Sequence, residues 1–389
     1  MILTLDTENT IFAKGNPFSE GNKCCVVGYK INDKQSVALS WEYDEPVSQD
    51  KLTLIQGLLD ECTLLVGFNL KYDLHWLRKY GLALPKKTYC TQVAQFVIRN
   101  QQEKYPSLDS SCAYWGLGQK LNVIEEEYWS KGINTDQIPW KLLDEYSRQD
   151  VDLTYSLFLK QQEYLRSNPS KKSQLINLLN QDLLVLEEME WHGLVFDTQL
   201  AESRSNALTK EIEELDKNIR SIIGPYPINF NSTDHVSCIL YGGTIRFKNS
   251  EPYEHIYKSG QRAGVPVIRY KHSFNDVTFE QLVKPLEGSE LAKKGYWSTD
   301  AGTFKKLRPK GKARSIIQLL QQRAEKEQLV STYYIGWPNR IVEMKWPANE
   351  VHSSLNQCVA VTGRLSSNGP NQQNVPSEVY DCIKTRAQE

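Results

Sequence analysis

The sequence of 389 residues lacks the charge surplus, the paired cysteines and the long apolar runs that mark several common protein classes. It holds 46 basic and 47 acidic residues, and this balance excludes a uniformly basic nucleic-acid binder while leaving room for a local basic patch. None of the eight cysteines forms a CxxC pair, so we expect reduced, mostly buried thiols in a cytosolic protein. No apolar run is long enough to span a bilayer, and we expect no membrane association.

The first part of the chain alternates strand and helix patterns. Its length, with 40% hydrophobic and 24% charged residues, fits two or three globular domains. Period-two and short apolar runs predict strands, and apolar spacing of three and four predicts helices. The strands are expected at 1–5, 24–31, 35–41 and 63–68, and the helices at 52–59, 70–80, 93–100 and 140–162. This mixture predicts an α/β domain with a mixed sheet.

The second part reads differently. A polar, breaker-rich stretch at 166–173 indicates a linker or turn. Weak periodicity and scattered glycine, proline, tyrosine and lysine over 242–300 predict irregular structure with short hairpins. Elsewhere we expect helices at 175–191, 200–223 and 316–334, and a strand at 351–361.

Three short motifs place acidic residues along the first domain. Asp6 and Glu8 are two apart on a predicted strand, so both side chains face the same side. Asn69 is placed to cap a helix, and Asp73 follows one turn into it. Tyr146 and Asp150 are four apart on a helix and share a face. Each motif alone also fits ordinary surface acids or amphipathic helices, so their order is the stronger signal.

In this order the motifs resemble those of the DEDDy proofreading 3′→5′ exonucleases. The resemblance implies an RNase H-like fold in which Asp6, Glu8, Asp73 and Asp150 bind two Mg²⁺ or Mn²⁺ ions and Tyr146 orients the attacking water. The chemistry agrees, because crowded carboxylates repel without cations and hard cations prefer oxygen ligands. Asn69 and Phe12 are predicted DNA contacts. Phe12 would stack on terminal bases, with a place in the core as its alternative.

Residues 362–376 read TGRLSSNGPNQQNVP, which is similar to the template–primer motif of family A DNA polymerases. Four short segments resemble the thumb of that family. They are residues 184–197, 230–232, 240–242 and 297–300. The resemblance implies that Arg364, Asn371 and Asn374 contact the template–primer or neighbouring protein. A run of basic residues without an intervening acidic residue is predicted to contact DNA phosphates, with a solvated face as the alternative. The run comprises Lys305, Lys306, Arg308, Lys310, Lys312 and Arg314.

The predicted organisation is an RNase H-like exonuclease domain (1–165), a linker (166–180), a mainly helical thumb (181–345) with the insertion 242–300, and the start of a palm (346–389). The predicted function is the proofreading 3′→5′ exonuclease and DNA-holding portion of a phage-type family A polymerase. It would act in DNA replication in the bacterial cytoplasm, including during phage infection.

Because the polymerase acids of that family lie beyond residue 389, we expect no primer extension from this chain alone. We expect instead a second polypeptide that carries palm and fingers. One alternative is a non-catalytic DNA-binding or scaffolding subunit of a split polymerase. Another is an RNase D-like RNA exonuclease, against which the thumb-like strings argue.

Overall fold

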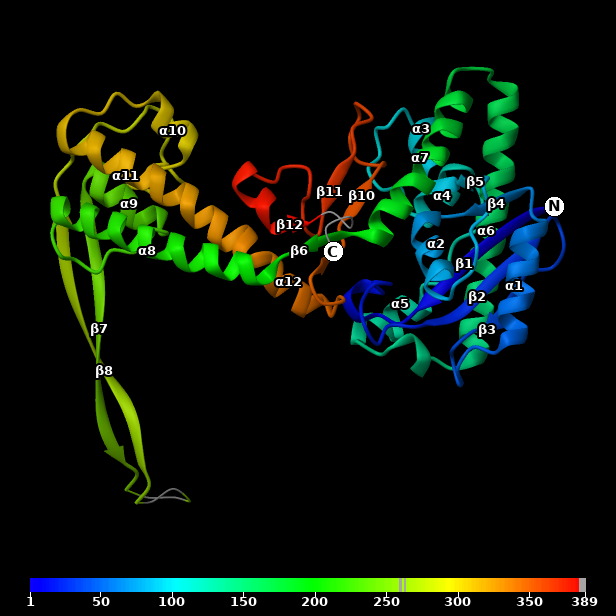
Figure 1. Cartoon of the computed structure of the whole chain (residues 1–389), viewed down its shortest axis with the longest axis horizontal. Helices are drawn as coiled ribbons and strands as arrows, with labels where there is room; N and C mark the ends of the chain where they lie inside the picture. The colour runs from blue at the N-terminus through cyan, green and yellow to red at the C-terminus, as the bar shows by residue number, and fades with distance from the viewer. Residues whose placement is uncertain (259–260, 262–263, 385–389) are drawn as a thin grey trace. The chain divides into compact units, whose positions relative to one another are not determined.

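The computed structural model describes residues 1–258, 261 and 264–384, and its chain divides into two compact units (Figure 1). Unit 1 combines Met1–Thr198 with the chain from Trp337 onward, and unit 2 is Gln199–Gly336. The described part of the segment expected as the start of a palm, 346–384 of 346–389, lies in the same compact unit as the first domain. All eight cysteines are free thiols and all but Cys62 are buried, as expected.

A five-stranded sheet forms the centre of unit 1, in the order β3-β2-β1-β4-β5. The first three strands pair antiparallel, whereas β1 with β4 and β4 with β5 pair parallel, so the predicted mixed sheet is confirmed. The parallel pairs follow from the helices that return the chain between those strands. The strands are β1 (Ile2–Asn9), β2 (Cys24–Ile31), β3 (Val37–Ser40), β4 (Leu64–Gly67) and β5 (Thr88–Cys90).

Helices cover both faces of this sheet. Leu3 and Leu5 of β1 face an apolar cluster formed with helices α1 and α2, which contribute Ile55 and Leu74. The opposite face carries helix α6, which contacts β1, β2, β3 and β4. The helices of the unit's first part are α1 (Gln49–Glu61), α2 (Leu70–Lys79), α3 (Thr91–Ile98), α4 (Leu108–Tyr114), α5 (Val123–Glu127), α6 (Trp140–Ser167) and α7 (Lys172–His192), with 3-10 turns η1 (Phe12–Lys14), η2 (Trp129–Lys131) and η3 (Thr135–Gln137).

Two local expectations in unit 1 need correction. The predicted linker or turn is a short turn at 168–171, within the breaker-rich stretch, but the rest of 166–180 is helical because α6 continues to Ser167 and α7 begins at Lys172. The strand expected at 351–361 is broken into β9 (Glu350–Val351) and β10 (Ser354–Asn356). The break has a physical cause, since buried His352 bonds the carbonyl of Glu190 and Ser353 donates to the carbonyl of Pro370.

Short strands tie the end of the chain to the segment that follows α7. Strand β6 (Leu194–Phe196) lies between β12 (Ile383–Lys384) and β9, and both pairings are antiparallel. Strand β10 pairs with β11 (Ser366–Asn368), and the 3-10 helix η5 (Ser377–Cys382) precedes β12. The template–primer-like string 362–376 therefore lies on a small structured region rather than on a free tail.

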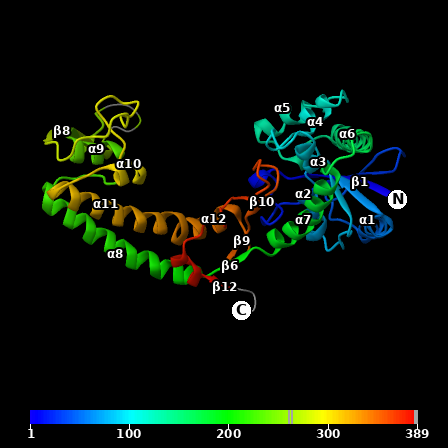
Figure 2. The same ribbon diagram turned by 90° about the horizontal axis from the view of Figure 1, so that it is seen from above.

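Unit 2 is mainly helical. Its helices are α8 (Thr198–Ile223), α9 (Thr233–Tyr241), α10 (Ala301–Lys306) and α11 (Gly311–Gln328), followed by a π-helical turn η4 (Leu329–Tyr334); α12 (Gly336–Met344) then begins. Helices α8 and α11 run side by side (Figure 2). Ion pairs of 2.7 Å between Arg323 and Asp216 and 2.6 Å between Lys326 and Glu211 join them.

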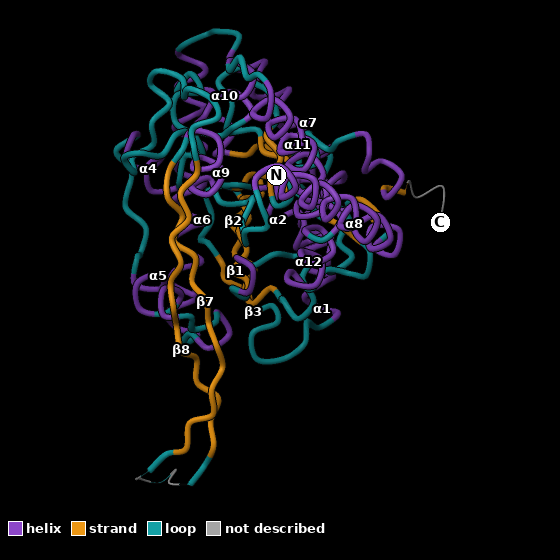
Figure 3. Tube along the Cα trace, turned by 90° about the vertical axis from the view of Figure 1, so that its left-hand side faces the viewer, coloured by secondary structure: helices purple, strands orange, loops and turns teal. Residues whose placement is uncertain are grey.

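A long antiparallel ribbon in unit 2 replaces the short hairpins expected over 242–300, whereas residues 280–300 are irregular, as expected, apart from one isolated bridge between Glu290 and Trp297. Strands β7 (Gly243–Ile256) and β8 (Pro266–Phe279) pair without interruption along their full length (Figure 3). Only Ile245 and Phe247 at its base are buried, whereas Ile268 farther out is 67% exposed. Because most of the ribbon is solvated on both faces, its sequence carries no regular apolar alternation to reveal it. Among the helices that the structure describes, none has the length and apolarity needed to cross a membrane.

Candidate active site

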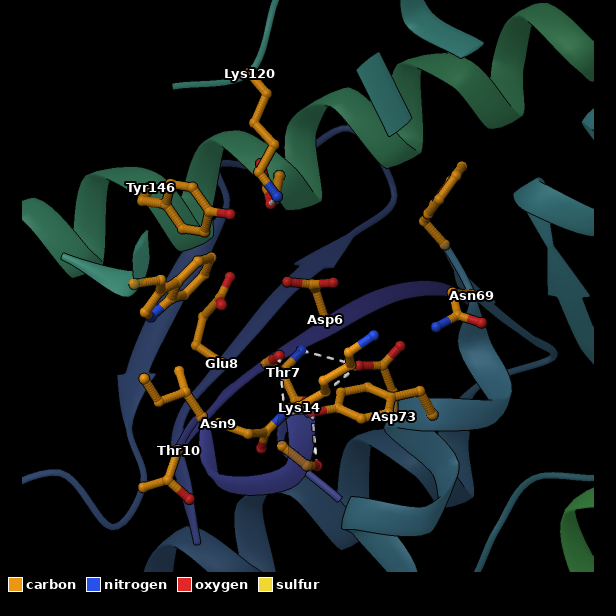
Figure 4. Close-up of a pocket in the computed structure, with 16 residues that line it drawn as sticks. Asp6, Thr7, Glu8, Asn9, Thr10, Lys14, Asn69, Asp73, Lys120 and Tyr146 are labelled. Atoms are coloured by element: carbon orange, nitrogen blue, oxygen red, sulfur yellow. Dashed lines mark hydrogen bonds and ion pairs between the residues drawn. The ribbon is translucent and has the colours of Figure 1, made fainter. Parts of the chain in front are cut away.

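A cavity of about 490 Å³ opens in unit 1 beside the carboxyl-terminal half of β1 (Figure 4). Side chains from β1, from the start of α2, from α6 and from the loop before α5 line it. The polar and aromatic ones that matter below are Asp6, Thr7, Glu8, Asn69, Asp73, Lys120, Trp129, Tyr146 and Asp150. All five residues predicted from the exonuclease-like motifs thus line one cavity.

Three acids converge inside it, and we call Asp6, Glu8 and Asp150 the acid cluster. One carboxylate oxygen from each lies within 4.8 Å of the others. Asp6 and Glu8 alternate with Leu5 and Thr7 along β1 and so face α6, from which Asp150 projects. Glu8 and Asp150 are buried and Asp6 is half-buried. The cluster therefore follows directly from strand alternation and from the helix laid across it.

Gly28 allows that helix to come so close. It pairs with Asp6 across β1 and β2. A Cβ atom placed on Gly28 would lie 2.4 Å from Ser147 Oγ and 2.9 Å from Val151 Cγ2, both on α6. The missing side chain thus permits the close approach that brings Asp150 over β1. Sequence reasoning missed Gly28, because a glycine within a strand has no signal for a specific neighbour.

Asp73 reaches the cavity from the other side of the sheet. Its Oδ1 accepts hydrogen bonds from the Thr7 backbone N at 3.1 Å and from Thr7 Oγ1 at 2.8 Å. It is buried and lies outside the acid cluster, but burial and then the charge of Asp6 raise its pKa well above the ordinary value. Asn69, at the start of the same helix, has a left-handed backbone with φ of 53° and makes no side-chain cap, so that part of the expectation is wrong.

The acids hold protons unusually tightly. Burial, followed by the charge of Asp150, raises the pKa of Asp6 to about 7. Burial and Asp6 raise the pKa of Glu8 well above its ordinary value, and burial raises that of Asp150. Burial is the largest cause in each case; negative neighbours in the cluster add to it for Asp6 and Glu8, whereas Lys120 opposes it for Asp150. A bound cation would relieve this repulsion.

Tyr146 is buried on the same face of α6 as Asp150. Its ring meets Trp129 edge-on, with centroids 5.7 Å apart, and its hydroxyl points toward the acid cluster (Figure 4). Burial and then the charges of Glu8 and Asp150 raise the pKa of its phenol far above the ordinary value. The hydroxyl is thus a fixed, protonated hydrogen-bond partner beside the acids.

Lys120 is the basic neighbour of the acid cluster, and sequence reasoning missed it. Its Nζ lies 2.5 Å from Asp150 Oδ2, and 4.6 Å from the centre of the Tyr146 ring. Burial lowers the pKa of Lys120, but the charges of Asp150 and Glu8 outweigh this and raise it. One lysine among 46 basic residues, in a loop without a motif, gives no sequence signal.

The donor set fits divalent metal ions. It offers converging carboxylate oxygens, which Mg²⁺ and Mn²⁺ prefer, and no soft ligand. Asp150 Oδ1 is buried without a hydrogen-bond partner, an unusual state for a carboxylate oxygen. A cation placed there would satisfy this oxygen and the raised proton affinities together.

The predicted DNA contacts lie on exposed surface. Phe12 is 39% exposed with Lys345 Nζ 4.5 Å above its ring, so the core alternative for Phe12 is not realised. Arg364, Asn371 and Asn374 are exposed, and Asn371 Oδ1 accepts from the Gln373 backbone. The six basic residues of the run from Lys305 to Arg314 are exposed around the junction of α10 and α11. Within the described part of the chain, no ion pair involves them.

Comparison with known proteins agrees with this geometry. Residues 3–166 match the family model of the 3′-5′ exonuclease, and residues 268–388 match that of DNA polymerase family A. The chain is a relative of the family A DNA polymerases. A DNA polymerase I from Pseudomonas aeruginosa is 24% identical over 99% of the chain and 38% of its own length. The DNA polymerase of Bacillus phage SP01 is 25% identical over 81% of the chain and 34% of its own length.

The chain spans about a third of the length of the curated proteins that it matches. DNA polymerase I of Synechocystis is 25% identical over 90% of the chain and 31% of its own length. The polymerase domain of Pol1 from M. smegmatis, solved with a DNA primer-template and dNTP, has a similar fold. Its TM-score is 0.63 at 16% identity, over 99% of this chain and 53% of that one.

Proposed function

We propose that unit 1 is a metal-dependent 3′→5′ exonuclease that removes nucleotides from DNA 3′ ends. The observation that supports this most directly is the acid cluster, with three carboxylate oxygens within 4.8 Å of one another, in the region that matches the 3′-5′ exonuclease model. Two divalent ions held there would supply charge neutralisation at the phosphate and an activated water.

The chain's own residues would have distinct roles. Asp6, Glu8 and Asp150 would hold the metal, and Asp73 would join them from α2, where Thr7 fixes its orientation. The Tyr146 hydroxyl would orient the attacking water by a hydrogen bond, since its raised phenol pKa keeps it protonated. Phe12, which is exposed beside the cavity-lining residue Ile11, would stack on the terminal base, and Asn69 would contact the strand.

DNA holding is proposed for exposed residues outside the cavity. The run from Lys305 to Arg314 would contact backbone phosphates. Arg364, Asn371 and Asn374 would contact the template–primer, in the region that matches DNA polymerase family A. A second polypeptide that carries palm and fingers stays a prediction.

The test is digestion of single-stranded DNA labelled at its 5′ end, with Mg²⁺ or Mn²⁺. The variant Asp150→Asn should lose activity by at least about 100-fold, because loss of groups that merely support metal ligands already costs 10- to 100-fold. Asp152→Asn is the matched control, since Asp152 lies on the same helix but pairs outward with Lys30 at 2.8 Å.

Shortening from the 3′ end by the wild type, lost in Asp150→Asn and kept in Asp152→Asn, would support the proposal. Equal rates in all three proteins would refute the site. A wild type inert with both metals would favour the non-catalytic DNA-binding subunit. Digestion of an RNA strand in preference to DNA would favour the RNA exonuclease.

A further inference from the structure

Lys120 places a positive charge beside the acid cluster, where the proposed function places a divalent metal ion. Within the described part of the chain, it is the one basic side chain at ion-pair distance from the acid cluster. Lys14 also lines the cavity, but Figure 4 shows it on the side of Asp73, away from Asp150's partner Lys120. The Lys120 side chain is only 25% exposed, so water screens its charge poorly.

The loop that carries Lys120 is fixed on both sides. The Lys120 backbone N donates to Asp109 Oδ1 at 3.1 Å, which ties the loop to α4. The Leu121 backbone N donates to Gln149 Oε1 at 2.8 Å, next to Asp150 on α6. The ammonium group is thus directed to Asp150 by the fold, while the flexible lysine stem still allows it to move.

The charges in this space do not balance without a cation. Three carboxylates face each other and one Asp150 oxygen has no partner. The single ammonium group closely contacts one of the three acids, through Asp150 Oδ2 at 2.5 Å. A divalent ion that used the free Oδ1 would place a second cation on the same carboxylate, where the two positive charges repel each other. Lysine and metal therefore compete for Asp150.

We propose that Lys120 is a resident counter-cation, which stabilises the acid cluster in the metal-free protein and gives up Asp150 when divalent ions bind. This inference rests on the proposed metal-dependent function. Lys120 is in this sense a positioning residue, because it acts through the acids. Its release on metal binding would also leave one positive charge at the cavity wall, where a DNA phosphate would approach.

The experiment compares three variants of the full chain with the wild type. Lys120→Met removes the charge but keeps an unbranched stem, and Lys120→Arg keeps the charge. Lys131→Met is the matched control, because Lys131 lies in the same region and pairs with Glu127 on the surface. Each protein is melted in EDTA and then titrated with Mn²⁺ by calorimetry.

For Lys120→Met we expect a Tm lower by about 2–4 °C in EDTA, together with Mn²⁺ affinity about tenfold tighter than the wild type. Lys120→Arg and Lys131→Met should behave as the wild type in both measurements. A purely structural role for Lys120 would lower the Tm of Lys120→Met and also weaken its Mn²⁺ binding. The direction of the change in Mn²⁺ affinity therefore distinguishes a counter-cation from a structural residue.

Unchanged or weaker Mn²⁺ binding by Lys120→Met would overturn the inference, and so would a wild type that binds no Mn²⁺. The proposed function fails separately. If the wild type binds Mn²⁺ and Lys120→Met binds it more tightly, but DNA is not digested, the counter-cation stands and the exonuclease does not.

Discussion

Glu190 is the centre of a buried charged network, and its substitution gives the clearest stability prediction. Its Oε1 accepts from Lys71 Nζ and from the Leu355 backbone N, both at 2.5 Å. Its Oε2 lies 2.8 Å from His75 Nε2. The variant Glu190→Gln keeps the shape of the side chain but leaves Lys71 without its ionic partner inside unit 1.

Removing one partner of a buried ion pair typically costs 3–5 kcal/mol, because the other charge stays buried and uncompensated. Lys71 keeps its bond to the Leu355 carbonyl and some contact with water, so we expect the lower end, about 3 kcal/mol at pH 7. The control is Glu188→Gln on the same helix, whose side chain is 63% exposed. It should change the free energy of unfolding by less than about 0.5 kcal/mol.

The effect should depend on pH with a definite sign. Burial raises the pKa of Glu190, but the bonds from His75 and Lys71 outweigh it and lower the pKa below the ordinary 4.5. A carboxyl group with a lowered folded pKa stabilises the protein above its unfolded pKa and loses this as pH falls through the folded value. Urea unfolding should therefore show a full difference at pH 7 that shrinks below pH 4.5. A difference under 1 kcal/mol at pH 7, or one that grows in acid, would refute this reasoning.

Two further predictions concern binding. Replacing Lys305, Lys306 and Arg308 by Gln should weaken duplex DNA binding alike for unrelated sequences, and should reduce the slope of log K against log salt by about 3 in titrations; an unchanged slope would place these bases on a solvated face. Since the pKa of Asp6 is about 7, protons compete with metal below that pH, so Mn²⁺ should bind about tenfold more weakly at pH 6 than at pH 8 in calorimetry. The same raised pKa makes the metal-free protein more stable at pH 6 than at pH 8, and the opposite trend in melting would contradict it.

Much of unit 1 is predictable from local pattern because its strands are short apolar runs covered on both faces and its helices each bury one face. Strand β2 begins and ends where the alternation predicts, and α2 and α6 begin at their predicted first residues. The pairing of Tyr146 with Asp150 needs only helix geometry. The proximity of Asp6 to Asp150 does not follow from pattern, since it depends on which helix crosses β1 and on how close Gly28 lets it come.

The features that the sequence did not predict have two physical origins. The ribbon of β7 and β8 is solvated along most of its length, so burial leaves no period in its sequence. Lys120 acts through a contact made across the fold, and spacing along the chain cannot show such a contact. The break between β9 and β10 likewise depends on His352, which bonds a backbone carbonyl on α7. Long-range contacts of single side chains decided the last two of these features, whereas solvation explains the first.

Helix α2 connects the two regions of unit 1 that the comparisons assign to different families. Lys71 and His75 lie on one of its faces and hold Glu190 of α7, while Lys71 also donates to the carbonyl of Leu355 on β10. Asp73 lies on another face and reaches the cavity. Because a helix is a stiff element, the contacts of Lys71 with Glu190 and Leu355 also restrain the first turn of α2, which carries Asp73. The network around Glu190 therefore stabilises unit 1 and, at the same time, fixes the position of one of the proposed metal ligands.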